Sequence, residues 1–139
     1  MWKWYAILSA IFAALTAVFA KIGVKNIDSN LATAIRTCVV IVIVWGIVIA
    51  SNSFYEIKNL TKHNWIFLIL SGVATGLSWL FYFKALQAGD VSKVVPIDKL
   101  SVLFTILLSF LILKEPFSWK VLIGCLCITG GALIIFMDK

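Results

Sequence analysis

The chain has 139 residues, of which 63% are hydrophobic and 13% are charged, and its formal net charge is +6. A soluble domain carries about 25% charged residues, so this composition excludes an ordinary water-soluble fold. Lipid solvates apolar side chains directly, and lysines in short loops account for the positive charge without a nucleic acid partner.

Charged residues leave five apolar runs, and each is interpreted as a helix that crosses the membrane. A hydrocarbon core about 30 Å thick needs roughly 20 helical residues. Asp28 or Ser29 is expected to cap the second helix, and Gly89 to stop the third. The sequence thus predicts an all-α integral membrane domain over residues 1–139, with helices at about 4–22, 31–50, 64–87, 92–113 and 118–137.

The lysines that flank these helices are balanced between the two membrane surfaces. With five crossings the termini lie on opposite sides, and the side of Met1 is called side A and the other side B. Each side has five lysines: Lys3, Lys58, Lys62, Lys114 and Lys120 on side A, and Lys21, Lys25, Lys84, Lys93 and Lys139 on side B. Because an excess of positive residues orients a membrane protein, this balance predicts dual topology.

Three further charges lie inside predicted spans. Arg36 is in the second helix, and Asp98 and Lys99 are in the fourth. Both helices enter from side B, so the three share a depth of roughly 8–10 Å. Intramembrane charges are costly and usually pair or face an aqueous cavity. We predict that Asp98 faces a cavity and is held by Arg36 or Lys99, with Lys84 completing the charge cluster. A purely structural ion pair, or snorkelling to the interface, is the alternative.

Pro96 lies two residues before Asp98 and cannot donate a backbone hydrogen bond. It is therefore the predicted hinge, where the fourth helix bends.

Milder polar residues form two stripes at helical spacing. Ser71, Thr75, Ser78 and Tyr82 share one face of the third helix, and Asp98, Ser101, Thr105 and Ser109 share one face of the fourth. Trp79 lies beside the first stripe, away from the tryptophans at the membrane boundary. Packing is the alternative, since Ser and Thr can satisfy their own helix carbonyls. The predicted substrate-binding residues are Thr75, Ser78, Trp79, Tyr82, Ser101 and Thr105.

Small residues mark predicted helix contacts. Gly72 and Gly76 form a GxxxG pair in the third helix, and the fifth helix carries Gly124, Gly130 and Gly131. Such residues let backbones approach closely in a membrane. The fifth helix is therefore expected to serve packing and dimerisation.

No catalytic pattern is present. The single histidine, His63, falls in a predicted loop, and the sequence has no paired carboxylates, HExxH motif or nucleophile elbow. We therefore expect neither an enzyme nor a metal or other cofactor.

Several segments together resemble the EamA-type proteins of the drug/metabolite transporter superfamily, specifically the short five-helix members. They are FAKIG at the end of the first helix, LATAIRT (Leu31–Thr37), GLSWLFYFKALQAGDVSKVVPIDKLSV (Gly76–Val102), LKEP (Leu113–Pro116) and GGALII (Gly130–Ile135). The central stretch is the most specific, and the resemblance covers almost the whole chain.

The resemblance implies one half of an inverted-repeat transporter fold. Full-length relatives have ten helices, built as two inverted halves around a substrate cavity, and work by alternating access. This chain is then expected to be a multi-pass protein of the cytoplasmic (inner) membrane, moving a small metabolite or amphipathic solute as an antiparallel homodimer. A glutamate used for coupling in distant four-helix relatives has no counterpart in the first helix. The alternative is a non-transporting membrane subunit that stabilises or regulates another membrane protein.

Overall fold

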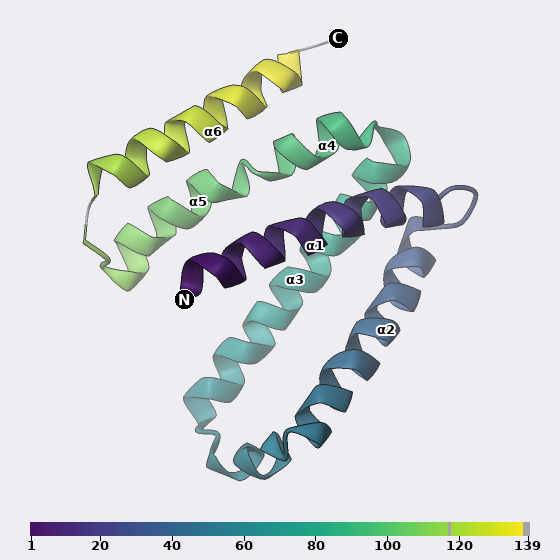
Figure 1. Cartoon of the computed structure of the whole chain (residues 1–139), viewed down its shortest axis with the longest axis vertical. Helices are drawn as coiled ribbons and strands as arrows, with labels where there is room; N and C mark the ends of the chain where they lie inside the picture. Colours follow the sequence, from purple (N-terminus) through teal and green to yellow (C-terminus); the bar gives the residue numbers. More distant parts are fainter. Residues whose placement is uncertain (117, 138–139) are drawn as a thin grey trace. The chain divides into compact units, whose positions relative to one another are not determined.

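The computed structural model describes residues 1–116 and 118–137, and every regular element in these ranges is a helix (Figure 1). Lys139, one of the side B lysines, lies outside them. The elements are α1 (Trp2–Gly23), α2 (Ser29–Ala50), the 3₁₀ helix η1 (Ser53–Asn59), α3 (Lys62–Ala88), α4 (Val91–Asp98), α5 (Ser101–Leu108), the π-helix η2 (Ser109–Leu113) and α6 (Trp119–Met137).

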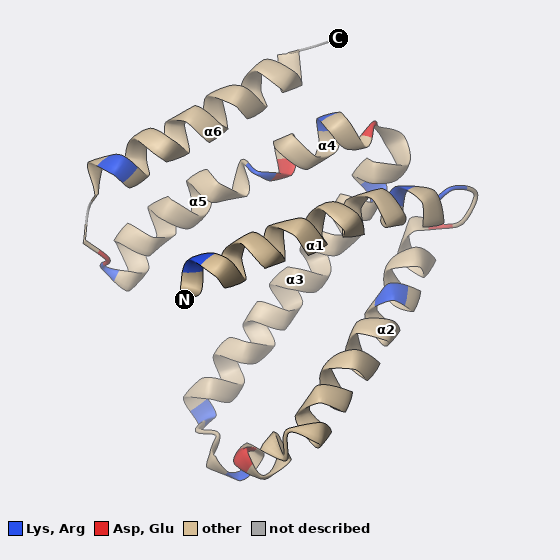
Figure 2. Cartoon of the chain, viewed as in Figure 1, with Lys and Arg blue, Asp and Glu red and all other residues tan. Residues whose placement is uncertain are grey.

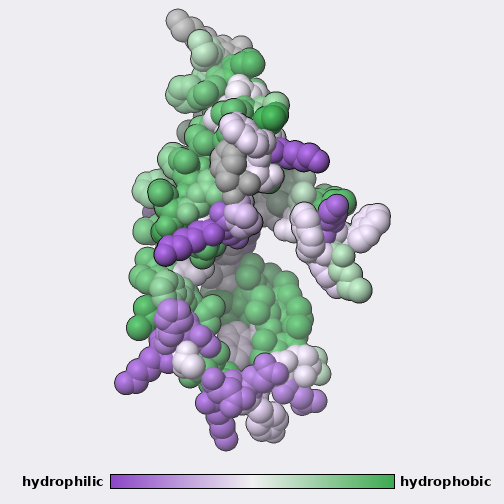
Figure 3. All heavy atoms as spheres, turned by 90° about the vertical axis from the view of Figure 1, so that its left-hand side faces the viewer, coloured by the Kyte–Doolittle hydropathy of each residue, from purple (hydrophilic) through white to green (hydrophobic). Residues whose placement is uncertain are grey.

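Among the described residues, five segments are long and apolar enough to cross a membrane, which confirms the predicted all-α, five-helix fold class. They are Trp2–Gly23, Ser29–Ala50, Lys62–Ala88, Val91–Leu113 and Trp119–Met137. Most of their large hydrophobic side chains are exposed, and apolar residues cover much of the face shown in Figure 3. Such a surface is stable only where lipid replaces water.

Local chemistry fixes where α2 begins. The Asp28 Oδ1 atom accepts hydrogen bonds from the backbone N–H groups of Asn30 at 2.9 Å and Leu31 at 3.1 Å. These bonds satisfy two donors that a helix start leaves unpaired, so Asp28 is the N-cap.

The fourth span differs from the unbroken helix expected at 92–113. A turn at Lys99 and Leu100 separates α4 from α5, and the backbone N–H groups of Lys99 and Leu100 donate to the carbonyls of Pro96 and Ile97. These are the shorter i to i−3 bonds of a 3₁₀ turn, which often mark a hinge or local strain. Because Pro96 has no backbone N–H group, the Ser92 carbonyl lacks its usual helical hydrogen bond. The turn at Lys99 and Leu100 therefore follows a helix that already lacks one bond.

The chain divides into two compact units. The α2–α3 unit is Phe19–Gln87, and the α4–α6 unit is Met1–Val18 with Ala88–Lys139. The first has an apolar cluster of Val24, Ala32 and Phe83, with Ala20 and Tyr82 packed against it. In the second, α6 packs against α4 and α5.

Candidate functional site

The side chain of Arg36 lies against the aromatic face of α3. Its guanidinium carbon is 4.1 Å from the centroid of the Trp79 ring and 5.5 Å from that of Phe83. A cation within about 6 Å of a ring centroid is attracted by the negative ring face. Trp79 and Phe83 are four residues apart on α3, so one helix face presents both rings to Arg36.

The neighbouring cluster explains why this face of α3 meets α2. Phe83 is 3% exposed and packs with Ala32, one turn before Arg36 on α2. Tyr82 packs at the edge of the same cluster. The small Ala32 side chain leaves room for the rings, and burial of Phe83 holds the two helices in this register.

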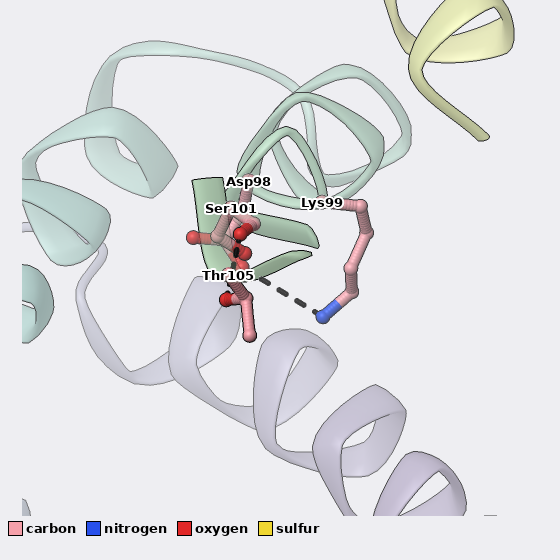
Figure 4. A network of polar contacts seen from close by, with 4 residues as sticks. All are labelled: Asp98, Lys99, Ser101 and Thr105. Atoms are coloured by element: carbon pink, nitrogen blue, oxygen red, sulfur yellow. Dashed lines mark hydrogen bonds and ion pairs between the residues drawn. The ribbon is translucent and has the colours of Figure 1, made fainter. Parts of the chain in front are cut away.

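Asp98 and Lys99 form an ion pair at the junction of α4 and α5. The Lys99 Nζ atom lies 3.7 Å from the Asp98 Oδ2 atom, and the two side chains are 50% and 40% exposed, respectively (Figure 4). Figure 2 shows charged residues mainly at helix ends and in loops, with this junction and one position within α2 as exceptions. Arg36 belongs to the other unit, so its contact with Asp98 stays a prediction.

In both polar stripes, a threonine hydroxyl donates a hydrogen bond to a backbone carbonyl of its own helix. The Thr75 hydroxyl donates to the Ser71 carbonyl and the Thr105 hydroxyl to the Ser101 carbonyl, each at 2.8 Å (Figure 4 for the second). Thr75, Ser78, Ser101 and Thr105 are exposed within the chain, and Tyr82 and Trp79 are half-buried. Each threonine oxygen still has a lone pair that can accept from a ligand.

The remaining predicted residues stand apart from these groups. Lys84 is exposed on α3. Apart from its chain neighbours and its own helix backbone, a Cβ atom added at any of the five predicted packing glycines would meet no atom within 4 Å; these are Gly72, Gly76, Gly124, Gly130 and Gly131. Across residues 1–116 and 118–137, no three His, Cys, Asp or Glu side chains are grouped as metal ligands.

Two hydrogen bonds between the Lys21–Ile27 segment and the end of α3 are not predicted from the sequence. The Lys21 Nζ atom donates to the backbone carbonyl of Leu86 at 2.6 Å, and Gln87 donates from its Nε2 atom to the Ile27 carbonyl at 2.9 Å. A pocket of about 660 Å³ lies beside these bonds, lined by Lys21, Ile22, Val24, Lys25, Asn26 and Gln87. No spacing signals such a contact, because the residues are more than 50 positions apart in sequence.

Comparison with known proteins places this architecture in a family. The model of the EamA-like transporter family matches residues 1–137. A Sinorhizobium sp. protein named "Uncharacterized transporter in cobO 3'region" is 45% identical over 134 residues, covering 96% of this chain and 95% of that protein. An uncharacterized transporter of Synechocystis sp. is 29% identical over 84 residues, covering 59% of this chain and 24% of that protein. No solved structure matches the chain.

In residues 1–116 and 118–137, five membrane-length helices with charged and aromatic groups inside the spans define a multi-pass membrane protein. The chain belongs to the EamA-like transporter family. Membership of this family and the names of the relatives indicate a membrane transporter of small-molecule solutes rather than an enzyme.

Proposed function

We propose that the chain is one protomer of an antiparallel homodimer that moves a small metabolite or amphipathic solute by alternating access. Its place is the cytoplasmic (inner) membrane. The proposal rests mainly on the charged residues that lie inside two of the membrane spans. Arg36 lies seven residues after Ser29 at the start of α2, and Asp98 lies seven after Val91 at the start of α4. Seven residues rise about 10 Å, deep enough that a charge needs a partner or a wet cavity.

The proposed path is lined by the polar faces of α3 and of the broken fourth span. Trp79 and Tyr82 supply aromatic surface, and Ser78 with Thr75 supplies polar contacts on the same helix. Ser101 and Thr105 continue the lining after the α4–α5 turn. A site with apolar walls and a few polar groups that converge on the ligand suits an amphipathic solute. The turn after Pro96 serves as the hinge that lets this wall change shape during access.

Three observations support an antiparallel pair. The flanking lysines are balanced, which removes the usual bias toward one orientation. The Sinorhizobium relative has nearly the same length, whereas the Synechocystis match covers only 24% of a longer protein. Gly124 and Gly131 of α6 have open space where a Cβ atom would lie, so a second backbone can approach them. Inverted repeats with the site at their interface are a recurring transporter design.

The test is solute flux through purified protein in liposomes. Uptake of labelled metabolites is compared with empty liposomes and with a Trp79→Leu variant of equal folded yield. Saturable uptake that falls in the variant supports the proposal. Absence of flux for the whole panel would favour the alternative, a membrane subunit that stabilises or regulates another protein.

A further inference from the structure

Arg36 is a cation whose contacts in its own unit are aromatic rings. The α2–α3 unit, Phe19–Gln87, is described in full, and its two acidic residues are Asp28 and Glu56. Asp28 lies before α2 and caps that helix, and Glu56 lies in η1 beyond its other end. Neither forms an ion pair with Arg36, and the guanidinium makes no hydrogen bond within this unit. Its charge is thus held in place without being neutralised there.

The ring contact leaves the binding edge of the guanidinium available. A cation over a ring uses the flat face of the guanidinium, whereas its N–H groups point outward in the plane. That planar fork matches the two oxygens of a carboxylate, forming two parallel charge-assisted hydrogen bonds. Arg36 is half-buried, so the side chain is fixed yet reachable. The stacking on Trp79 orients the fork before a ligand arrives.

We infer that the transported solute is an amphipathic organic monoanion, whose carboxylate is bound by Arg36 and whose apolar body lies along Trp79 and Tyr82. This inference rests on the proposed transport function and names its substrate class. A single charge is expected because the nearest basic residue of α3, Lys84, lies five positions after Trp79. Five helical positions turn about 140°, so the two side chains leave the helix on different sides. A dianionic phosphate would lack a second cation on this face.

The first measurement compares acids with their neutral amides. Protein in nanodiscs of phosphatidylcholine is titrated with indole-3-acetate and benzoate, and with indole-3-acetamide and benzamide, while thermal unfolding is followed. A ligand that binds the folded state raises the midpoint. At least one acid should raise it, and its matched amide should not. Equal shifts for acid and amide, or no shift for either acid, would overturn the inference.

The second measurement changes the cation. Loss of a charge-assisted bond pair in Arg36→Gln should weaken acid binding by about tenfold to a hundredfold. Arg36→Lys keeps the charge but loses the planar fork, so binding should weaken less. Lys25→Gln, at an exposed lysine between α1 and α2, is the control and should bind normally. Retention of full affinity in Arg36→Gln would contradict the assignment, and the acid–amide comparison in the wild type stands if this variant fails to fold.

Anionic lipid headgroups offer the same oxyanion chemistry, so nanodiscs with phosphatidylglycerol form the third arm. If Arg36 binds the solute, the acid still raises the unfolding midpoint in these nanodiscs, where phosphatidylglycerol competes with it. If phosphatidylglycerol alone stabilises the protein through Arg36 and abolishes the acid response, lipid is the ligand and the inference fails. If only the transport proposal fails, the acid still binds through Arg36, but liposomes show no uptake of it.

Discussion

The guanidinium carbon of Arg36 lies 4.1 Å from the ring centroid of Trp79, and this contact joins α2 to α3 within the membrane-length part of both helices. It gives an intramembrane cation an attractive partner that does not cancel its charge. Such a contact contributes about 0.5–2 kcal/mol, more where water is excluded. Arg36 is therefore both a helix contact and a group able to bind an anion.

Replacing the Trp79 ring should separate the helix contact of Arg36 from its binding of an anion. Trp79→Phe keeps an aromatic face and should alter solute affinity with little loss of folded protein, whereas Trp79→Leu should lower the free energy of unfolding by about 1–2 kcal/mol. Unfolding in mixed detergent micelles, followed by circular dichroism, gives the free energy of unfolding of each variant, and titration with the solute gives its affinity. Trp65→Leu, a half-exposed tryptophan at the start of the same helix, is the control. A double-mutant cycle of Trp79→Leu with Arg36→Gln should show coupling, and additive effects would contradict the contact.

The ion pair at the α4–α5 junction should show compensation. Asp98→Asn leaves Lys99 unpaired inside a span, where an uncompensated charge costs about 2.5–3.5 kcal/mol at the membrane centre and less nearer the surface. Adding Lys99→Gln should recover part of the lost stability, measured as the unfolding midpoint in detergent. If the double variant is less stable than Asp98→Asn alone, the two groups do not balance each other.

Gly131 and its neighbour Ala132 should separate assembly from folding. A Cβ atom at Gly131 would meet no atom within 4 Å apart from its chain neighbours and its own helix backbone, so Gly131→Leu should leave the protomer folded and weaken the dimer. Ala132 is 3% exposed, so Ala132→Leu should cost the protomer about 1–3 kcal/mol through overpacking. Cross-linking in bilayers measures assembly and thermal unfolding measures the fold. Normal assembly of Gly131→Leu would remove α6 from the interface.

The contact from Lys21 to the Leu86 carbonyl should stabilise the end of α3. A cationic donor near a helix C-terminus satisfies an unpaired carbonyl and interacts with the helix dipole. Lys21→Met should lower the free energy of unfolding by about 1–2 kcal/mol, because the half-buried bond involves a charged group. Lys25→Met, an exposed lysine of the same pocket, should change it little. Equal effects of the two variants would refute a specific role for this bond.

The sequence predicts the spans well because membrane thickness and the spacing of charged residues determine them. It also singles out Arg36 by its depth and Trp79 by its distance from the membrane boundary. It does not pair them, since the pairing depends on how α2 and α3 are rotated about their axes, and a nearly uniform apolar helix carries little signal for rotation. The sequence indicates a bend near Pro96, but it does not place the turn at Lys99 and Leu100. The π-helix at Ser109–Leu113 is missed, because a continuously hydrophobic segment carries no signal for a change in backbone hydrogen bonding.

Orientation in the membrane tests the antiparallel protomer most directly. In a variant with Cys38, Cys125 and Cys127 replaced by alanine, single cysteines at the exposed positions Asn59 and Asp90 report sides A and B. An impermeant thiol reagent applied to intact cells should label part of each population, and the remainder should react only after the cells are opened. Removing two side A lysines, with Lys58→Gln and Lys62→Gln, should shift the protein toward one orientation with side B in the cytoplasm. Dual topology predicts mixed labelling at both positions, and labelling of one position from outside and the other only from inside would contradict it.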